Sequence, residues 1–312
     1  MTRSRRTLIA VYILSASLAL IEAVLRGMGL ANPILYEPDA KTGYRLKPDQ
    51  HVTALGNKIT INNVGLRDPR PVSRAENGVH RVLVLGDSVT WGGVTIPQES
   101  LFTTRLERAI ASTEFLNGGV NGYSVGQMTA LYTARYAAIH PDLLLVCVIP
   151  PDFSRPANVS LTRNSAAFPL ERPWTACGMA VEYARIQMAS RFSLNALRPK
   201  SPVSPAPGSA ETPTDRLEEN IDALTAIATQ AKPRVAVVVL PQMPGTAGSE
   251  HRVEVLARLG GLGMTVIDLA PRKSWSATHF LDGTHLSESG HAAVAETLAP
   301  LLTPLLASLS LE

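Results

Sequence analysis

The pattern that most constrains the fold is a series of short apolar runs that alternate with segments of helical character. The apolar runs cover residues 81–86, 114–118, 142–149, 234–240 and 264–269. Helices are expected at residues 98–112, 125–139, 215–230, 249–260 and 287–308. Strands that alternate with helices form a parallel sheet covered on both faces. Five strands joined by right-handed crossovers predict a flavodoxin-like three-layer α/β/α sandwich.

The N-terminal segment, residues 1–31, is predicted to lie outside this domain as a membrane anchor. Residues 7–25 carry a single charge, Glu22, and are just long enough for a spanning helix of about 20 residues. Three arginines precede the run: Arg3, Arg5 and Arg6. Because positive charges stay cytoplasmic, we expect a single-pass protein of the cytoplasmic (inner) membrane whose remaining chain faces the periplasm or the exterior.

Two alternatives to an anchor stay open. A secretory signal peptide would be cleaved at Gly29-Leu30-Ala31, which is a weak match to a small-residue site. A buried helix of a soluble protein is disfavoured by the three arginines directly ahead of the run. The apolar run exceeds a usual signal core, which favours the uncleaved anchor.

After the anchor we expect a small β-rich segment, here called the lead-in, and then a main domain that contains one insertion. Residues 32–79 are rich in turn formers with short strands between them, which predicts a β-rich lead-in to a main domain at 80–312. Residues 150–214 break the alternation, with one helix expected at 178–197 and a flexible Pro/Ser/Ala-rich linker at 200–214. This insertion is either a lid over the site or a surface excursion.

Composition excludes several classes of protein. The formal net charge is only +3 and there is no basic stripe, so nucleic acid is not an expected partner. Two cysteines do not make a disulfide framework. His279, His285 and His291 are too loosely spaced for a zinc set, and no Gly-rich phosphate loop follows a strand, so neither metal nor cofactor is expected. The oligomeric state stays open.

Candidate catalytic residues stand at the two ends of the main domain. The first apolar run leads into Gly-Asp-Ser, which places Ser88 at the carboxyl end of a strand, where open α/β folds bind ligands. Near the C-terminus, Asp282 and His285 are three residues apart, just ahead of the last helix. A serine nucleophile needs a base and an acid that orients the base. We therefore predict Ser88, His285 and Asp282 as a catalytic triad.

Three blocks of this sequence resemble those of the SGNH/GDSL hydrolases: "GDSV", "LNGGVNGYSVGQ" at 116–127 and "DGTH". The resemblance covers about residues 80–310 and extends to about residue 36 if membrane-anchored bacterial members are included. It implies a flavodoxin-like fold and an esterase, lipase, deacetylase or polysaccharide O-acetyltransferase. It also implies that Gly122 lends its amide to the oxyanion hole.

One block departs from the family pattern. After the third strand the family shows Gly-x-Asn-Asp, whereas this chain has "VIPPDF", so Asp152 matches and Pro151 stands in the place of Asn. Proline has neither a side-chain donor nor a backbone N–H, so one oxyanion donor is missing or comes from elsewhere. Asn117 and Asn158 are candidates for that donor.

Other residues near these motifs have structural interpretations. Trp91 either lines the pocket beside Ser88 or packs beneath the loop. Asp87 is expected to bond loop amides, and His291 to be a surface or packing residue. Arg67 and Asp68 are expected to tie the lead-in to the core.

Three functions remain open at the level of sequence. The first is a serine esterase, or acyl-transfer enzyme, acting on an acyl ester, expected to be acetyl, of an extracytoplasmic carbohydrate or lipid. The second is a weakened relative that binds a glycan without turnover, and the third is a membrane-anchored subunit for exopolysaccharide assembly. The complete set of Ser88, Asp282 and His285 favours the first.

Overall fold

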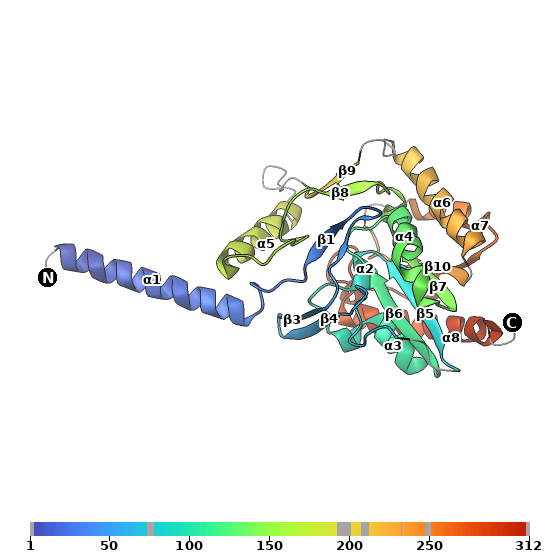
Figure 1. Ribbon diagram of the computed structural model, residues 1–312, viewed down its shortest axis with the longest axis horizontal. Coiled ribbons are helices and arrows are strands. Elements are labelled where there is room, and N and C mark those ends of the chain that lie inside the picture. Colours follow the sequence, from blue (N-terminus) through green and yellow to red (C-terminus); the bar gives the residue numbers. More distant parts are fainter. Residues whose placement is uncertain are drawn as a thin grey trace.

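A five-stranded parallel sheet forms the centre of the molecule (Figure 1). The computed structural model describes residues 3–73, 78–191, 201–206, 212–231, 233–246 and 251–309. The central strands are β5 (His80–Gly86), β6 (Thr113–Gly119), β7 (Leu143–Val148), β10 (Arg234–Val239) and β11 (Thr265–Asp268). They are hydrogen-bonded in the order β11-β10-β7-β5-β6, and all four pairings are parallel. This is the flavodoxin-like order, so the predicted fold class is confirmed.

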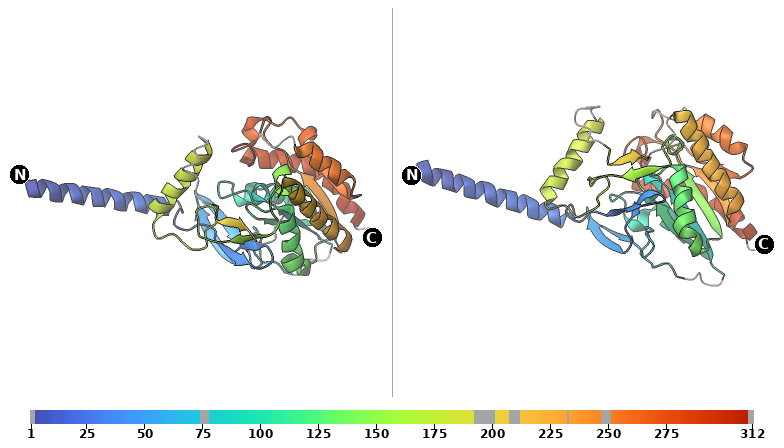
Figure 2. Two further views of the ribbon diagram at one scale, coloured as in Figure 1. Left: turned by 90° about the horizontal axis from the view of Figure 1, so that it is seen from above. Right: turned by 45° about the horizontal axis from the view of Figure 1, so that its top comes forward.

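Helices cover both faces of this sheet (Figures 1 and 2). One face carries α3 (Phe102–Ala109) and α8 (Glu288–Leu309). The other face carries α4 (Val125–Leu131), α6 (Pro213–Gln230) and α7 (His251–Gly260). Side chains of a strand alternate between faces, so Val82 and Val84 of β5 enter the first layer while Leu83 and Leu85 enter the second. This two-sided burial explains why the strand sequences are apolar throughout.

Two predicted helices are shorter or less regular than expected. The helix expected at 98–112 is a 3₁₀ turn at Gln98–Ser100 followed by α3, because Leu101 between them is extended. The helix expected at 125–139 begins at α4, where Ser124 and Gln127 form a capping box. It then continues as a π-turn and a 3₁₀ turn, Tyr132–Tyr136 and Ala137–Ile139.

Two β-hairpins form the lead-in. They pair β1 (Tyr36–Asp39) with β2 (Gly43–Leu46), and β3 (Gln50–Ala54) with β4 (Asn57–Ile61). Their alternate apolar residues, including Tyr36, Tyr44 and Ile59, are buried in the same cluster as α4 and α6. The hairpins therefore share the core of the sheet domain.

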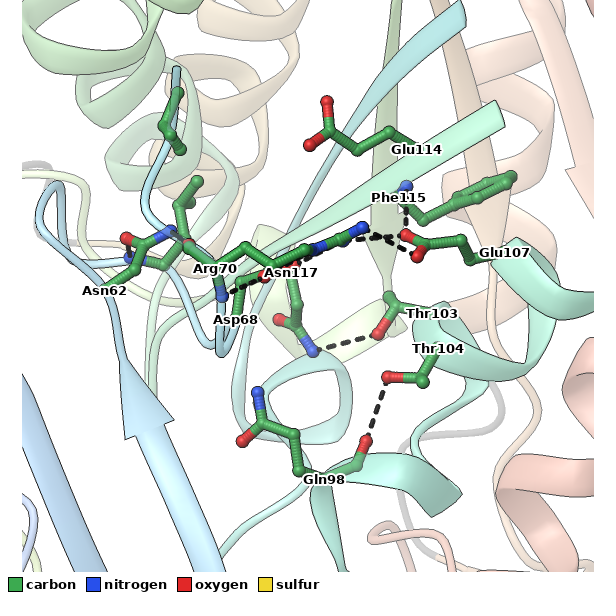
Figure 3. Close-up of polar contacts among 12 residues, drawn as sticks. Asn62, Asp68, Arg70, Gln98, Thr103, Thr104, Glu107, Glu114, Phe115 and Asn117 are labelled. Atoms are coloured by element: carbon green, nitrogen blue, oxygen red, sulfur yellow. Dashed lines mark hydrogen bonds and ion pairs between the residues drawn. The ribbon is translucent and has the colours of Figure 1, made fainter. Parts of the chain in front are cut away.

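Arg67 fastens the lead-in to the sheet domain, as the sequence predicted, whereas Asp68 contributes through Arg70, with which it pairs. The buried Arg67 donates from Nη1 to the carbonyls of Trp91 (2.5 Å) and Gly93 (2.6 Å), and from Nη2 to that of Ile96 (2.7 Å). Arg70 pairs with both Asp68 and Glu107 of α3, as Figure 3 shows.

The insertion contains more regular structure than the sequence indicated. It begins with a 3₁₀ turn at Pro150–Phe153 and includes the hairpin of β8 (Val159–Leu161) with β9 (Val203–Pro205). The helix α5 (Ala176–Arg191) lies between these two strands along the chain. The predicted linker at 200–214 thus contains β9 and the start of α6, and its residues 207–211 lie outside the described residues.

An exposed apolar helix, α1 (Arg3–Gly27), projects from the globular body at the N-terminal end (Figures 1 and 2). Within the described part of the chain, two helices are long and apolar enough to cross a membrane: Ser4–Gly27 of α1 and the whole of α8. Because α8 packs on one face of the sheet and against α3 on the same face, it belongs to the globular core.

Candidate active site

Ser88 lies at the carboxyl end of β5, at the start of the short helix α2 (Ser88–Trp91). Asp87 caps this helix, since its side chain accepts a hydrogen bond from Val89 N (2.8 Å). The neighbouring strand must approach closely here, because a Cβ on Gly119 would lie 2.3 Å from Trp91 N. The strand-to-helix turn thus holds Ser88 at the carboxyl end of the parallel strands, with 9% of its surface exposed.

The Asp282–His285 loop owes its shape to local hydrogen bonds. Asp282 Oδ1 accepts from the backbone N–H groups of Thr284 and His285, both at 2.8 Å. The loop is closed at its base, where Leu281 N donates to His285 O (2.8 Å). This tight turn explains why the two side chains meet at a spacing of three residues.

Three predicted residues lie in a hydrogen-bonded series. His285 Nε2 is 2.9 Å from Ser88 Oγ, and His285 Nδ1 is 2.8 Å from Asp282 Oδ2. The hydrogen bond with Asp282 raises the pKa of His285. Burial would raise the pKa of Asp282, but the hydrogen bonds from His285 and Thr284 outweigh it and hold that pKa below its usual value. An imidazole placed in this way can take a proton from a serine hydroxyl.

A buried ionic cluster beside Ser88 was not anticipated from the sequence. Arg155 Nη1 lies 3.1 Å from Asp87 Oδ2, 2.5 Å from Asp152 Oδ1 and 2.8 Å from the carbonyl of Tyr123. Asp87 Oδ2 is in turn 3.4 Å from Ser88 Oγ. One guanidinium therefore joins the turn that carries Ser88, the loop after β6 and the turn after β7. The charge of Arg155, placed shortly after the mismatched "VIPPDF" block, was the available sequence signal.

Asp152 is fully buried in this cluster. Its Oδ2 accepts from Ile149 N (2.9 Å), which holds the 3₁₀ turn that carries Pro151. Burial, and next the charge of Asp87, raise the pKa of Asp152 well above its usual value. Asp152, which matches the last position of the family block, thus holds the 3₁₀ turn at Pro150–Phe153 from its buried side.

Gly122 lies in the loop between β6 and α4 with a left-handed backbone (φ 74°). A Cβ there would approach Tyr44 Oη to 3.1 Å and Phe168 Cζ to 3.3 Å. Its loop is held on one side by Arg155 through Tyr123 and on the other by Tyr44 Oη, which donates to Asn121 O (2.8 Å). Both the conformation and the crowding favour glycine at this position.

The two candidate asparagines have other partners. Asn117 Nδ2 donates to Thr90 O (2.8 Å) and to Thr103 Oγ1 (3.4 Å), and its Oδ1 accepts from Gly119 N (2.9 Å). Figure 3 shows Asn117 directed toward Thr103. Asn158 donates to Glu219 of α6 (3.2 Å). Asn117 therefore braces the buried turn behind Ser88.

Trp91 and His291 are packing residues in this structure. Trp91 lies in the core with the guanidinium of Arg67 5.7 Å from its ring centroid, which favours the packing alternative. His291 is fully buried, stacks on Phe102 and accepts from Phe102 N (3.2 Å). Among the described residues, no group of three or more His, Cys, Asp and Glu side chains is arranged to hold a metal ion.

A flavodoxin-like sheet with a Gly-Asp-Ser turn at the carboxyl end of its first strand is the arrangement of the SGNH/GDSL class of α/β proteins. The chain belongs to the GDSL-like lipase/acylhydrolase family, whose model matches residues 82–298. The family resemblance inferred from the three sequence blocks is thereby confirmed. No match was found among curated proteins.

Several solved structures are similar to this chain. A member of the lipolytic G-D-S-L family from Veillonella parvula has 14% identity and a TM-score of 0.42, over 72% of this chain and 99% of its own. A lipase/acylhydrolase from Enterococcus faecalis has 12% identity and a TM-score of 0.44, over 72% and 96%. A variant of an acetyl-xylooligosaccharide esterase from Geobacillus has 11% identity and a TM-score of 0.42, over 73% and 95%.

Proposed function

We propose that this protein is a serine esterase that hydrolyses or transfers an acyl group through Ser88. The observation that carries the proposal is the pair of hydrogen bonds on His285, 2.9 Å to Ser88 Oγ and 2.8 Å to Asp282 Oδ2. Membership of an acylhydrolase family supports the same reaction class.

In the proposed reaction, His285 Nε2 takes the proton of Ser88 as Oγ attacks the ester carbonyl carbon. Asp282 accepts from Nδ1 and stabilises the imidazolium that forms. The tetrahedral intermediate collapses when His285 returns the proton to the leaving alkoxide, which leaves an acyl group on Ser88. Water then releases the acid, or a sugar hydroxyl takes the acyl group, with His285 again as the base.

Two backbone amides are proposed to form the oxyanion hole. Ser88 is the first residue of α2, where N–H groups have no acceptor within the helix. Gly122 supplies the second amide from the loop after β6. Pro151 supplies none, and the loss of one such donor typically costs about 100- to 1000-fold in rate. We therefore expect weak hydrolysis of simple esters, with the natural substrate or acceptor contributing binding energy that compensates.

The proposed substrate is an acyl ester, specifically an acetyl ester, on an extracytoplasmic carbohydrate or lipid. The support for an extracytoplasmic substrate is the predicted membrane topology. The apolar run of α1, residues 7–25, follows Arg3, Arg5 and Arg6 at the start of the same helix, and this order directs the catalytic domain to the outer side of a cytoplasmic membrane. A C-terminal alkaline phosphatase fusion should therefore be active. Activity only of a cytoplasmic reporter would contradict this topology.

The triad is tested on the full-length protein in detergent, with p-nitrophenyl acetate and a fluorophosphonate probe. Ser88→Ala and His285→Ala should each lower turnover by about three or more orders of magnitude. Asp282→Asn should also lower it strongly, because the tautomer and orientation of His285 change. Folding should survive, since none of these changes removes core volume. Wild-type turnover in Ser88→Ala would refute the assignment.

A second candidate, a glycan-binding or exopolysaccharide-assembly subunit without turnover, is favoured by Pro151 alone. Pro151→Asn separates the two. If the site is a working esterase with a deficient oxyanion hole, the restored amide should raise turnover of p-nitrophenyl acetate about tenfold. A folded variant with unchanged turnover would show that another group already fills the hole. Absence of turnover and of probe labelling in both proteins would favour the non-catalytic subunit.

A further inference from the structure

Glu22, to which the sequence assigned no role, connects the end of α1 to the insertion. Its two carboxylate oxygens accept from the backbone N–H groups of Ala176 (2.8 Å) and Cys177 (2.9 Å), the first residues of α5. It also pairs with Arg26 (2.6 Å), and Arg26 donates to the carbonyl of Trp174 (2.6 Å). A charge in the last turns of an apolar helix thus serves as the N-terminal cap of a second helix.

The position of this contact along α1 fixes where the start of α5 lies relative to a bilayer that α1 spans. Glu22 lies five residues before the end of α1, which corresponds to about 8 Å along the helix. If α1 spans a bilayer, Glu22 and the start of α5 lie at the outer boundary between lipid tails and head groups. Figures 1 and 2 show the start of α5 beside the C-terminal end of α1, with the two helices at an angle to each other.

The side of α5 that faces away from the protein is apolar. The exposed strip consists of Val181 (69% exposed), Ala184 and Met188 (48%), which recur at helical spacing on α5, together with Trp174 (96%), which lies two residues before the helix begins. Arg185 is exposed at its edge. The polar Glu182 is turned the other way and accepts from Ala166 N (3.0 Å) in the insertion. A helix on the surface of a soluble protein normally turns its apolar side chains toward the protein and its polar side chains toward water.

We propose that the exposed strip of α5 lies in the interfacial region of the same membrane that holds α1. The continuity of α5 with the end of the span, through Glu22 and Arg26, identifies the bilayer as the occupant. Tryptophan is favoured at the level of the head groups, and an apolar helix face that lies in the plane of the membrane is buried at the boundary between head groups and acyl chains. The catalytic domain is then held against the bilayer at two points. This inference rests on the proposed membrane anchoring and does not depend on the chemistry of Ser88.

Tryptophan quenching tests this contact in the full-length protein reconstituted in phosphatidylcholine nanodiscs. The chain has three tryptophans and α1 contains none, so emission reports only on the rest of the molecule. Lipids brominated near the ester end of their chains should quench the wild type and Trp275→Phe. They should not quench Trp174→Phe. No quenching of the wild type, or equal quenching in Trp174→Phe, would overturn the proposal.

Two further variants separate docking from folding and from anchoring. Val181→Asp places a charge at a solvent-exposed position, so the soluble fold should be unchanged in thermal unfolding while quenching of Trp174 falls several-fold. Glu22→Ala should also lower the quenching, because α5 loses its link to α1. In both variants the protein should still resist extraction from membranes by carbonate. Extraction of the wild type would refute the anchor itself, whereas a carbonate-resistant protein without quenching would refute only the docking of α5.

Discussion

The largest influence on the pKa of His285 is its hydrogen bond with Asp282. Because Asp282 accepts the Nδ1 proton, the pKa of His285 lies above the usual value of about 6.5. His285 must be neutral to act as a base, so kcat/KM for p-nitrophenyl acetate should rise with pH and reach half its maximum above pH 6.5. In Asp282→Asn this midpoint should move to lower pH. A midpoint that stays unchanged in Asp282→Asn would exclude His285 as the titrating base.

Arg155 contacts the site through its neighbours, since its guanidinium binds Asp87, which lies beside Ser88, and the Tyr123 carbonyl, which lies next to Gly122. Arg155→Met should lower kcat about 10- to 100-fold with little change in KM, because the amides of Ser88 and Gly122, the proposed oxyanion donors, lose their placement. It should also destabilise the fold by about 3 kcal/mol, since Asp87 and Asp152 lose their shared cation. Arg155→Lys keeps the charge and should recover stability more than kcat. Equal recovery of both by lysine would show that charge alone is required.

At the scale of elements, the lead-in stabilises the segment that follows α2. Arg67 reaches three carbonyls of the loop at residues 91–96 and is almost fully buried, so burial lowers its pKa to about 9. No carboxylate accepts from its guanidinium among the described contacts. The geometry of the turn after Ser88 therefore depends on a residue contributed from outside the sheet domain.

Substitution of this arginine should be costly. Arg67→Met removes the donor from three carbonyls, those of Trp91 and Ile96 in buried contacts and that of Gly93 in a partly buried one, and is expected to lower the free energy of unfolding by about 2–4 kcal/mol. Arg258→Gln is the control, because Arg258 and its partner Glu218 are 44% and 43% exposed, so the loss of this pair should cost about 1 kcal/mol or less. Urea unfolding measures both. Similar losses in the two variants would refute the special role of Arg67.

At the scale of the whole molecule, the interface between α8 and α3 contains a histidine that is held neutral. Burial, and next the charges of Arg67 and Arg105, lower the pKa of His291 to about 3. In the unfolded chain the same ring binds a proton below about pH 6.5. The unfolded state therefore gains protons as the pH falls from 6.5 toward 3, and stability falls by up to about 1.4 kcal/mol per pH unit.

This linkage predicts a difference between variants. His291→Gln keeps an acceptor for Phe102 N but does not titrate, so its free energy of unfolding should decline less than that of the wild type between pH 6.5 and 4. Chemical unfolding at a series of pH values measures the slopes. Parallel slopes for the wild type and His291→Gln would contradict the assignment.

The sequence by itself determined the α/β class, the strands and their order, and the three blocks that carry the family resemblance. These features follow from local periodicity and short spacings. The alternation of apolar and helical segments dictates the sheet, and the three-residue spacing of Asp282 and His285 lets one turn close by its own hydrogen bonds.

Only the tertiary structure decided which distant side chains meet. Asn117 was a plausible oxyanion donor by proximity in sequence, yet its amide is used by Thr90. Arg155 of the insertion reaches the carboxylate beside Ser88, and Glu22 of α1 caps α5 more than 150 residues later. Such pairings depend on the paths of irregular segments, which carry no periodic signal. They are selected by the need to give every buried charge and every helix end a partner once the sheet has formed.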